Sequence, residues 1–93
     1  MNIKYSSNSV DRMIQRNIST KDVEFILTEP DGKIKQPQDK YIFYKKLKGR
    51  KDNLLATVTV LRSKTSFEIV TVMINFEVKQ WKFITIQTLT TYL

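Results

Sequence analysis

The spacing of the apolar residues changes once along this chain, close to Lys33, and this change limits the folds open to it. Before Lys33 the apolar residues recur every three or four positions, which is the spacing of an α-helix. After Lys33, runs rich in β-branched and aromatic residues alternate with turn residues, as β-strands do. Helices followed by strands predict an α+β domain, with two N-terminal helices packed on an antiparallel sheet of three or four strands.

Two short helices joined by one tight corner are expected within residues 5–31. The first begins at Asn8, a favourable N-cap residue, and ends at Asn17, a residue type that tolerates the left-handed conformation. The second begins after Ser19, because Asp22 stands where it can complete a capping box. A proline-containing turn ends the second helix.

The rest of the chain is expected to form strands, followed by a C-terminal extension. The expected strands cover residues 33–36, 40–47, 54–61 and 67–76, with a basic loop at 48–53 and a hairpin turn at 62–65. The last of these strands is apolar on both faces, which is typical of a central strand. Residues 79–93 follow it and predict an additional strand or an interface segment. At 93 residues the chain is expected to form a single domain.

The chain contains neither cysteine nor histidine. Disulfides, thiolate metal sites and imidazole catalysis are therefore excluded, and we expect no metal ion and no organic cofactor. The N-terminus lacks the apolar core of a secretion signal, and no uncharged run is long enough to span a membrane. We therefore expect a cytoplasmic protein that does not contact a membrane.

Positive charge is in excess, because 16 Lys and Arg residues against 9 Asp and Glu residues give a net charge of +7. Such an excess favours RNA, DNA or an acidic protein as partner. Arg12 and Arg16 stand four residues apart, so both project from the same side of the first expected helix. Their guanidinium groups suit phosphate, whereas the alternative is a solvated helix face with an intrahelical pair to Asp11 or Gln15.

A second basic group lies on one expected strand, where Lys45 and Lys46 follow Tyr41, Phe43 and Tyr44. Lysine side chains attract a phosphate backbone, and aromatic rings can stack on bases. The alternative is that Tyr41 and Phe43 belong to the core, as aromatic residues at alternating strand positions usually do.

Two further segments supply candidate ligands for phosphate or bases. The basic loop contributes lysine and arginine side chains that either contact phosphate or form a solvated turn. Thr71 and Asn75 share one side of the last expected strand, where they either face a groove or satisfy local hydrogen bonds. The predicted nucleic-acid-binding residues are Lys46, Lys48, Arg50, Lys51, Thr71 and Asn75.

Residues 5–19 resemble the motif aromatic-Ser-x-His-Ala-x-x-Arg-Met-x-x-Arg-Gly-Ile-Ser, which opens the domain of unknown function 4258 family. The pairs that follow at 22–23 and 29–30, the strand at 41–45 and the apolar run at 69–72 also match in kind and order, so the resemblance covers roughly residues 3–78. This chain has Asn8 at the histidine position of the motif, Ser9 at the alanine position and Asn17 at the glycine position.

The resemblance implies a fold similar to the RelE-like and barnase-like group of small toxins and ribonucleases. Members of that group are often cationic toxins that cleave RNA and are neutralised by an antitoxin. What the resemblance implies here is a metal-independent endoribonuclease, with free or ribosome-associated RNA as substrate and an acidic antitoxin-like protein as partner.

Cleavage of RNA by its own 2′-hydroxyl needs a proton acceptor, charge stabilisation at the phosphorane and help for the leaving oxygen. Preorganised cations supply the second requirement. Tyr44 could donate a proton or stack on a base, whereas Asn8 cannot transfer a proton near neutral pH and is more simply explained as a helix cap. The candidate catalytic residues are Asn8, Arg12, Arg16, Tyr44 and Lys45.

Two other functions remain open on the sequence. One is a non-catalytic protein-interaction module, in which the basic face and residues 79–93 hold a partner or a second copy of the chain as a homodimer. The other is a nucleic-acid-binding module with a degenerate active site, whose affinity falls steeply with salt and which gives no product.

Overall fold

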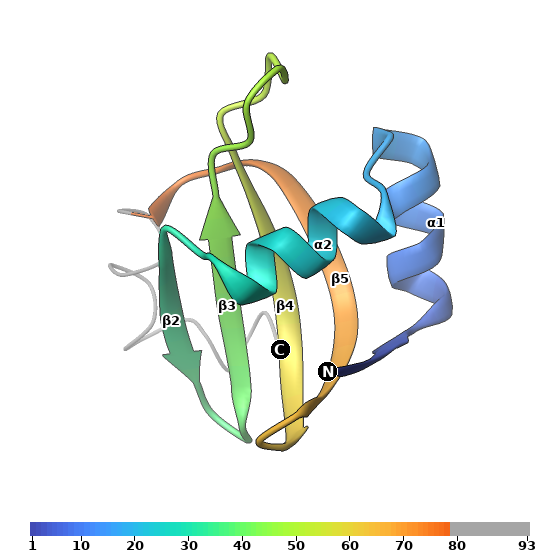
Figure 1. Ribbon diagram of the computed structural model, residues 1–93, viewed down its shortest axis with the longest axis vertical. Coiled ribbons are helices and arrows are strands. Elements are labelled where there is room, and N and C mark those ends of the chain that lie inside the picture. Colours follow the sequence, from blue (N-terminus) through green and yellow to red (C-terminus); the bar gives the residue numbers. More distant parts are fainter. Residues whose placement is uncertain (79–93) are drawn as a thin grey trace.

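The computed structural model describes residues 1–78 and confirms an α+β domain. In chain order the elements are β1 (Asn2–Tyr5), α1 (Ser7–Arg16), α2 (Thr20–Thr28), β2 (Gly32–Gln36), β3 (Lys40–Lys45), β4 (Leu54–Ser63) and β5 (Ser66–Phe76). α2 crosses one face of the sheet, and α1 stands beside the edge formed by β5 (Figure 1). Both helices contribute to the same apolar cluster. The additional strand or interface segment expected at 79–93 lies outside the described residues.

Five strands form one sheet in the order β1-β5-β4-β3-β2. β1 pairs with β5 in parallel, and every other neighbouring pair is antiparallel. The expectation of three or four antiparallel strands was therefore wrong, because a parallel strand is added at the edge beside β5. A strand as short as β1, with 4 residues, is too brief to establish an alternating pattern in the sequence.

The helix ends follow capping rules, although α1 begins earlier than expected. Its N-cap is Ser6 and not Asn8, since the Ser6 side chain accepts the backbone N–H three residues later at 3.0 Å. Asn17 ends α1 in the left-handed conformation with φ 53°, as expected. The predicted capping box of Ser19 and Asp22 is confirmed, with hydrogen bonds of 3.0 and 3.1 Å. Neither helix within residues 1–78 is long and apolar enough to cross a membrane.

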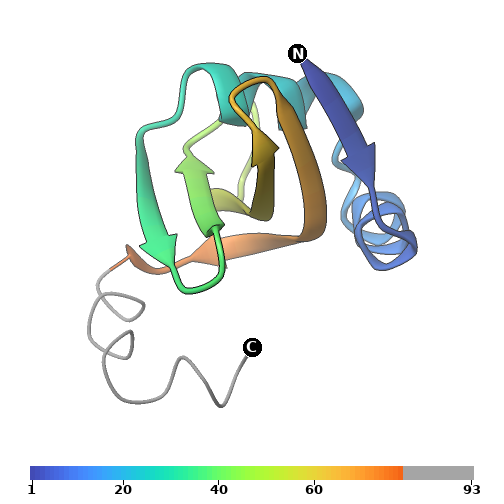
Figure 2. The ribbon, with the colours of Figure 1, turned by 90° about the horizontal axis from the view of Figure 1, so that it is seen from below.

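Apolar side chains form two clusters, one on each face of the sheet. The cluster under the helices includes Phe43, so the core alternative is confirmed for this ring, whereas Tyr41 is only partly buried against the cluster. The cluster on the opposite face consists of Ile42, Ala56, Val58 and Phe76. β5 is strongly bent and curls over this second face (Figure 2). The sheet is therefore curved, with its convex side covered by the helices.

Candidate nucleic-acid interface

The first helix lies along the part of β5 that β1 leaves unpaired. The backbone carbonyls of Val70 and Val72 on β5 accept hydrogen bonds from side chains in and just before α1. Ser6 Oγ donates to the Val70 carbonyl at 2.8 Å, and Arg16 Nη1 donates to the Val72 carbonyl at 2.7 Å. Asn8 Nδ2 adds a longer contact of 3.4 Å to the Val70 carbonyl. These side chains satisfy backbone groups that an unpaired strand edge would otherwise expose.

Arg12 and Arg16 share one side of α1, as predicted, but their surroundings differ. Arg16 is partly buried and bound to β5, whereas Arg12 is exposed. The Arg12 guanidinium has one long contact, 3.4 Å from Nη1 to Oε1 of Gln15, so the predicted intrahelical pair exists. Of the two arginines, Arg12 is therefore the one whose charge is open to a ligand.

The loop between β3 and β4 folds against the C-terminal end of α1 through Arg50. Arg50 donates from Nη1 to the Asn17 carbonyl at 2.7 Å and from Nη2 to the Arg16 carbonyl at 2.9 Å. Its Nε also donates to Asp52 Oδ1 at 2.7 Å. A guanidinium is favourable here because the last carbonyls of a helix lack intrahelical partners and carry partial negative charge. Sequence reasoning missed this structural role, since backbone carbonyls leave no mark in a sequence.

Two lysines, Lys45 and Lys46, lie where β3 passes into this loop. Lys46 Nζ donates to the Asp52 carbonyl at 2.7 Å. Lys45 Nζ lies 3.4 Å from Asp31 Oδ1 and 4.7 Å from the centre of the Phe25 ring. The Lys46 backbone N–H donates to Asp31 at 2.8 Å and, together with Lys45, lowers the pKa of that carboxyl below its ordinary value. The Asp31 carboxylate thus holds Lys45 and the backbone of Lys46, and the Asp52 carbonyl holds the Lys46 ammonium.

A pocket of about 370 Å³ opens between α2 and the end of β3. The Phe25 side chain at its wall is 42 % exposed. Sequence reasoning missed this ring, although its position off the apolar stripe of α2 was a signal that it would not be buried. The lining residues are Asp22, Phe25, Lys45, Lys46, Leu47 and Lys48.

Five of the predicted cations lie at the end of β3 and in the β3–β4 loop. This loop projects at one end of the molecule (Figure 1). Lys48 and Lys51 are exposed, and neither forms a hydrogen bond or ion pair with the rest of residues 1–78. The other three are held by the contacts given above. We call this group the basic end, and it consists of Lys45, Lys46, Lys48, Arg50 and Lys51.

The five predicted catalytic residues are not gathered into one site within residues 1–78. Tyr44 and Lys45 are consecutive on β3, so their side chains lie on opposite faces of the sheet. The Tyr44 ring packs against Phe76, with the ring centres 5.7 Å apart, in the cluster on the face away from the helices. Asn8 and Arg16 contact the edge of β5. In this part of the chain no three acidic side chains are grouped so that they could hold a metal ion.

The two predicted residues on β5 also differ in their surroundings. Asn75 Oδ1 accepts the backbone N–H of Asn53 at 2.9 Å, which ties the end of β5 to the loop of the basic end. Asn75 is thus engaged within the fold, although its partner is 22 positions away in the sequence and the bond is not the local one expected. Thr71 is partly buried and pairs with Val58 within the sheet, away from that loop.

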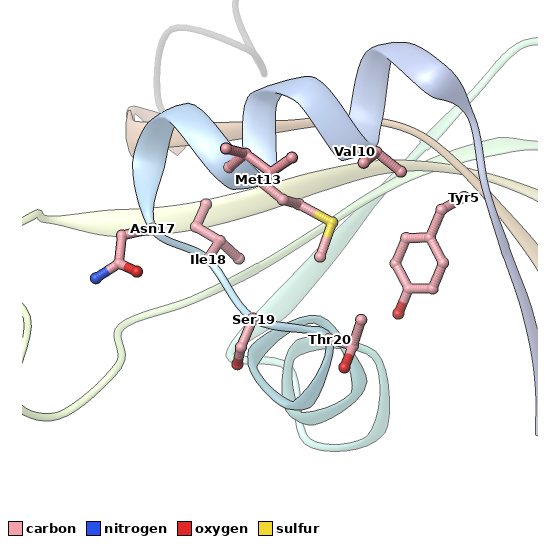
Figure 3. A pocket seen from close by; sticks show the side chains of 8 residues that line it. Tyr5, Val10, Met13, Asn17, Ile18, Ser19 and Thr20 are labelled. Atoms are coloured by element: carbon pink, nitrogen blue, oxygen red, sulfur yellow. The ribbon is translucent and has the colours of Figure 1, made fainter.

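A second pocket, of about 450 Å³, lies between α1 and α2 (Figure 3). The Tyr5 hydroxyl is buried beside it and has no hydrogen-bond partner within the described residues. Burial raises the pKa of Tyr5, and the nearby charge of Glu24 raises it further. This pocket has no cationic lining and so does not extend the basic end. It is lined by Tyr5, Val10, Met13, Ile14, Asn17, Ile18, Ser19 and Thr20.

The residues around α1 carry the motif that resembles the family named above. A family model described as Domain of unknown function (DUF4258) matches residues 5–86. The chain belongs to this family. The comparisons with curated proteins and with solved structures gave no match.

In this DUF4258 domain, most residues of the opening motif have structural roles. Ser6 and Ser19 cap the two helices, and Asn17 provides the left-handed end of α1. Arg16 closes the edge of β5. Arg12 is the motif arginine that remains exposed, and the basic end lies outside the motif altogether. The motif therefore describes how the helix pair is built and attached to the sheet.

Proposed function

We propose that this domain binds single-stranded RNA through the basic end and does not cleave it. The observation that carries the proposal is that three cations, Lys45, Lys46 and Lys48, line one pocket with the exposed Phe25 ring. The other two, Arg50 and Lys51, lie in the loop that follows. Each ammonium that neutralises a phosphate releases condensed counterions, and this release drives sequence-independent binding.

The contacts of the basic end divide its cations into two kinds. Arg50 and Lys46 both bind Asp52, and Arg50 also binds the end of α1, so the loop is held in one conformation. Lys48 and Lys51 are carried by this anchored loop and have no partner within residues 1–78. A preorganised loop loses less conformational entropy when it binds a ligand. Its unpartnered ammonium groups can bind phosphate without breaking an existing ion pair.

The exposed Phe25 ring favours a single strand over a duplex. Aromatic rings stack on unpaired bases, whereas the base faces of a duplex are buried in its own stack. Lys45 Nζ, 4.7 Å from the centre of this ring, is close enough to contact a phosphate next to a stacked base. The choice of RNA over DNA rests on the resemblance to the RelE-like group.

Cleavage, which the RelE-like resemblance implies, requires proton transfer and charge stabilisation at a single phosphate. Tyr44 lies across the sheet from Lys45, while Asn8 and Arg16 are engaged with β5. This arrangement supports binding without cleavage. A toxin neutralised by an acidic antitoxin is the alternative, and a specific RNA product would establish it.

The direct test compares two doubly substituted proteins that lose the same charge. Lys48→Ala/Lys51→Ala removes the unpartnered cations of the basic end, and we expect about tenfold weaker binding of a labelled single-stranded RNA in fluorescence anisotropy. Lys4→Ala/Lys64→Ala is the control, because these exposed lysines lie on β1 and in the β4–β5 turn, at the other end of the sheet. The control should lose less than about twofold.

Three results would contradict the proposal. The first is that wild type does not bind the RNA, and the second is that both double variants lose affinity equally. The third is a product on a denaturing gel that wild type forms and Arg12→Ala does not, because this would replace binding alone by cleavage.

A further inference from the structure

The face of the sheet that carries the helices also carries a row of lysines on β2, the edge strand, and on its neighbour β3. The register pairs Lys33 with Phe43 and Lys35 with Tyr41. Because Tyr41, Phe43 and Lys45 alternate along β3, all five side chains project from this face. The row Lys45, Lys33 and Lys35 therefore starts at the basic end and continues along β2 toward the β2–β3 turn.

This row is accessible because β2 is the outer strand of the sheet. Lys33 and Lys35 are exposed. α2 packs on β3 and β4, and it crosses the sheet without running along β2 (Figure 1). β2 contains no acidic residue, so its two cations are not neutralised from within the strand.

Lysine and aromatic side chains are combined in the same way at two points of the row. Lys45 Nζ lies 4.7 Å from the centre of the Phe25 ring, and Lys33 Nζ lies 5.9 Å from the centre of the Tyr41 ring. Phe25 and Tyr41 are both partly open to solvent. A phosphate that draws the ammonium away from its ring also frees the face of that ring for a base.

We propose that a single-stranded RNA bound at the basic end continues along β2, with phosphates on Lys33 and Lys35 and a base stacked on Tyr41. Same-face residues of a strand are about 7 Å apart, a spacing that successive phosphates of an extended strand can follow. This inference rests on the proposed function and defines its ligand as an extended strand of several nucleotides. Lysines on an edge strand also oppose pairing with other sheets, and this role is compatible with RNA binding.

The experiment compares a short and a long oligouridine, of about 4 and about 12 nucleotides, binding to the full chain. Lys33→Ala/Lys35→Ala should weaken binding of the long RNA about tenfold and that of the short RNA less than about twofold. Lys48→Ala/Lys51→Ala should weaken binding of both. Lys4→Ala/Lys64→Ala is the control for loss of two charges.

Tyr41 gives a second, independent readout. Tyr41→Leu should weaken binding of the long RNA several-fold, whereas Tyr41→Phe should keep wild-type affinity because the ring is retained. A circular dichroism melt that matches wild type shows that a variant is folded. If Tyr41→Leu is not folded, the comparison of Lys33→Ala/Lys35→Ala on the short and the long RNA carries the test alone.

The route along β2 would be overturned if Lys33→Ala/Lys35→Ala left the long RNA unaffected, or affected both lengths equally, while Lys48→Ala/Lys51→Ala still weakened both. The proposed function would survive that outcome. If wild type bound neither RNA, both proposals would be overturned.

Discussion

The edge of β5 and the basic end carry the same kinds of side chain but use them in opposite ways. At the β5 edge, Ser6 and Arg16 donate to the backbone carbonyls of Val70 and Val72. At the basic end, Lys48 and Lys51 are exposed and have no partner within residues 1–78. A cation bound to a backbone carbonyl stabilises the fold, whereas one carried by a loop that other residues anchor is free for a ligand.

The largest effect expected from this comparison is on stability at the β5 edge. Arg16→Ala leaves the Val72 carbonyl without its charged donor, so we expect the free energy of unfolding in urea to fall by about 1.5–3 kcal/mol. Arg12→Ala, one turn away on the same side of α1, should change it by less than about 0.5 kcal/mol. Equal losses from the two variants would show that the two arginines do not differ as described.

The next largest effect is on the pH dependence of stability, and it tests the Asp31 carboxylate at the basic end. The pKa of Asp31 is lowered in the folded chain, so the stability it provides is present above the ordinary pKa of 3.8 and is lost as the pH falls through the lower folded value. Asp31→Asn should therefore destabilise the protein at neutral pH, and the difference from wild type should shrink below about pH 4.

Urea unfolding of both proteins over this pH range measures that effect. Asp39→Asn, in the turn at the other end of β3, is the control for loss of a carboxylate and suits its left-handed conformation. A difference between wild type and Asp31→Asn that stayed constant down to acid pH would show that the carboxylate charge is not what holds the lysines.

The smallest effect concerns a polar group near α1 that has no partner. The Tyr5 hydroxyl is buried without a hydrogen bond in the described residues (Figure 3). Tyr5→Phe should leave the free energy of unfolding unchanged or raise it by up to about 1 kcal/mol, because it removes a desolvated group that gains nothing in return. If Tyr5→Phe instead lowered the free energy of unfolding by more than about 1 kcal/mol, the hydroxyl would have a hydrogen-bond partner in solution.

Local signals explain why both helices and four of the five strands could be predicted. The capping box of Ser19 and Asp22 and the left-handed Asn17 act within a few residues, so they are visible in the sequence. The start of α1 could not be predicted as well, because Ser6 and Asn8 are both good caps. The choice is made by tertiary structure, since Ser6 Oγ also donates to the Val70 carbonyl on β5.

The candidate site was predictable in its charge but not in its geometry. The loop with Lys48, Arg50 and Lys51 stands out by composition alone. That Arg50 is bound to the end of α1 could not be foreseen, because its partners are carbonyls far away in the chain. In contrast, the separation of Tyr44 from Lys45 follows from strand alternation and could have been recognised in the sequence.

The central claim is that phosphate binds at the basic end, and the salt dependence of RNA affinity tests it most directly. For a single strand, the logarithm of the binding constant falls against the logarithm of salt concentration with a slope of about −0.7 for each phosphate contacted. Loss of two phosphate contacts in Lys48→Ala/Lys51→Ala should therefore make this slope shallower by about 1.4, while Lys4→Ala/Lys64→Ala keeps the wild-type slope. An unchanged slope in Lys48→Ala/Lys51→Ala would contradict the account.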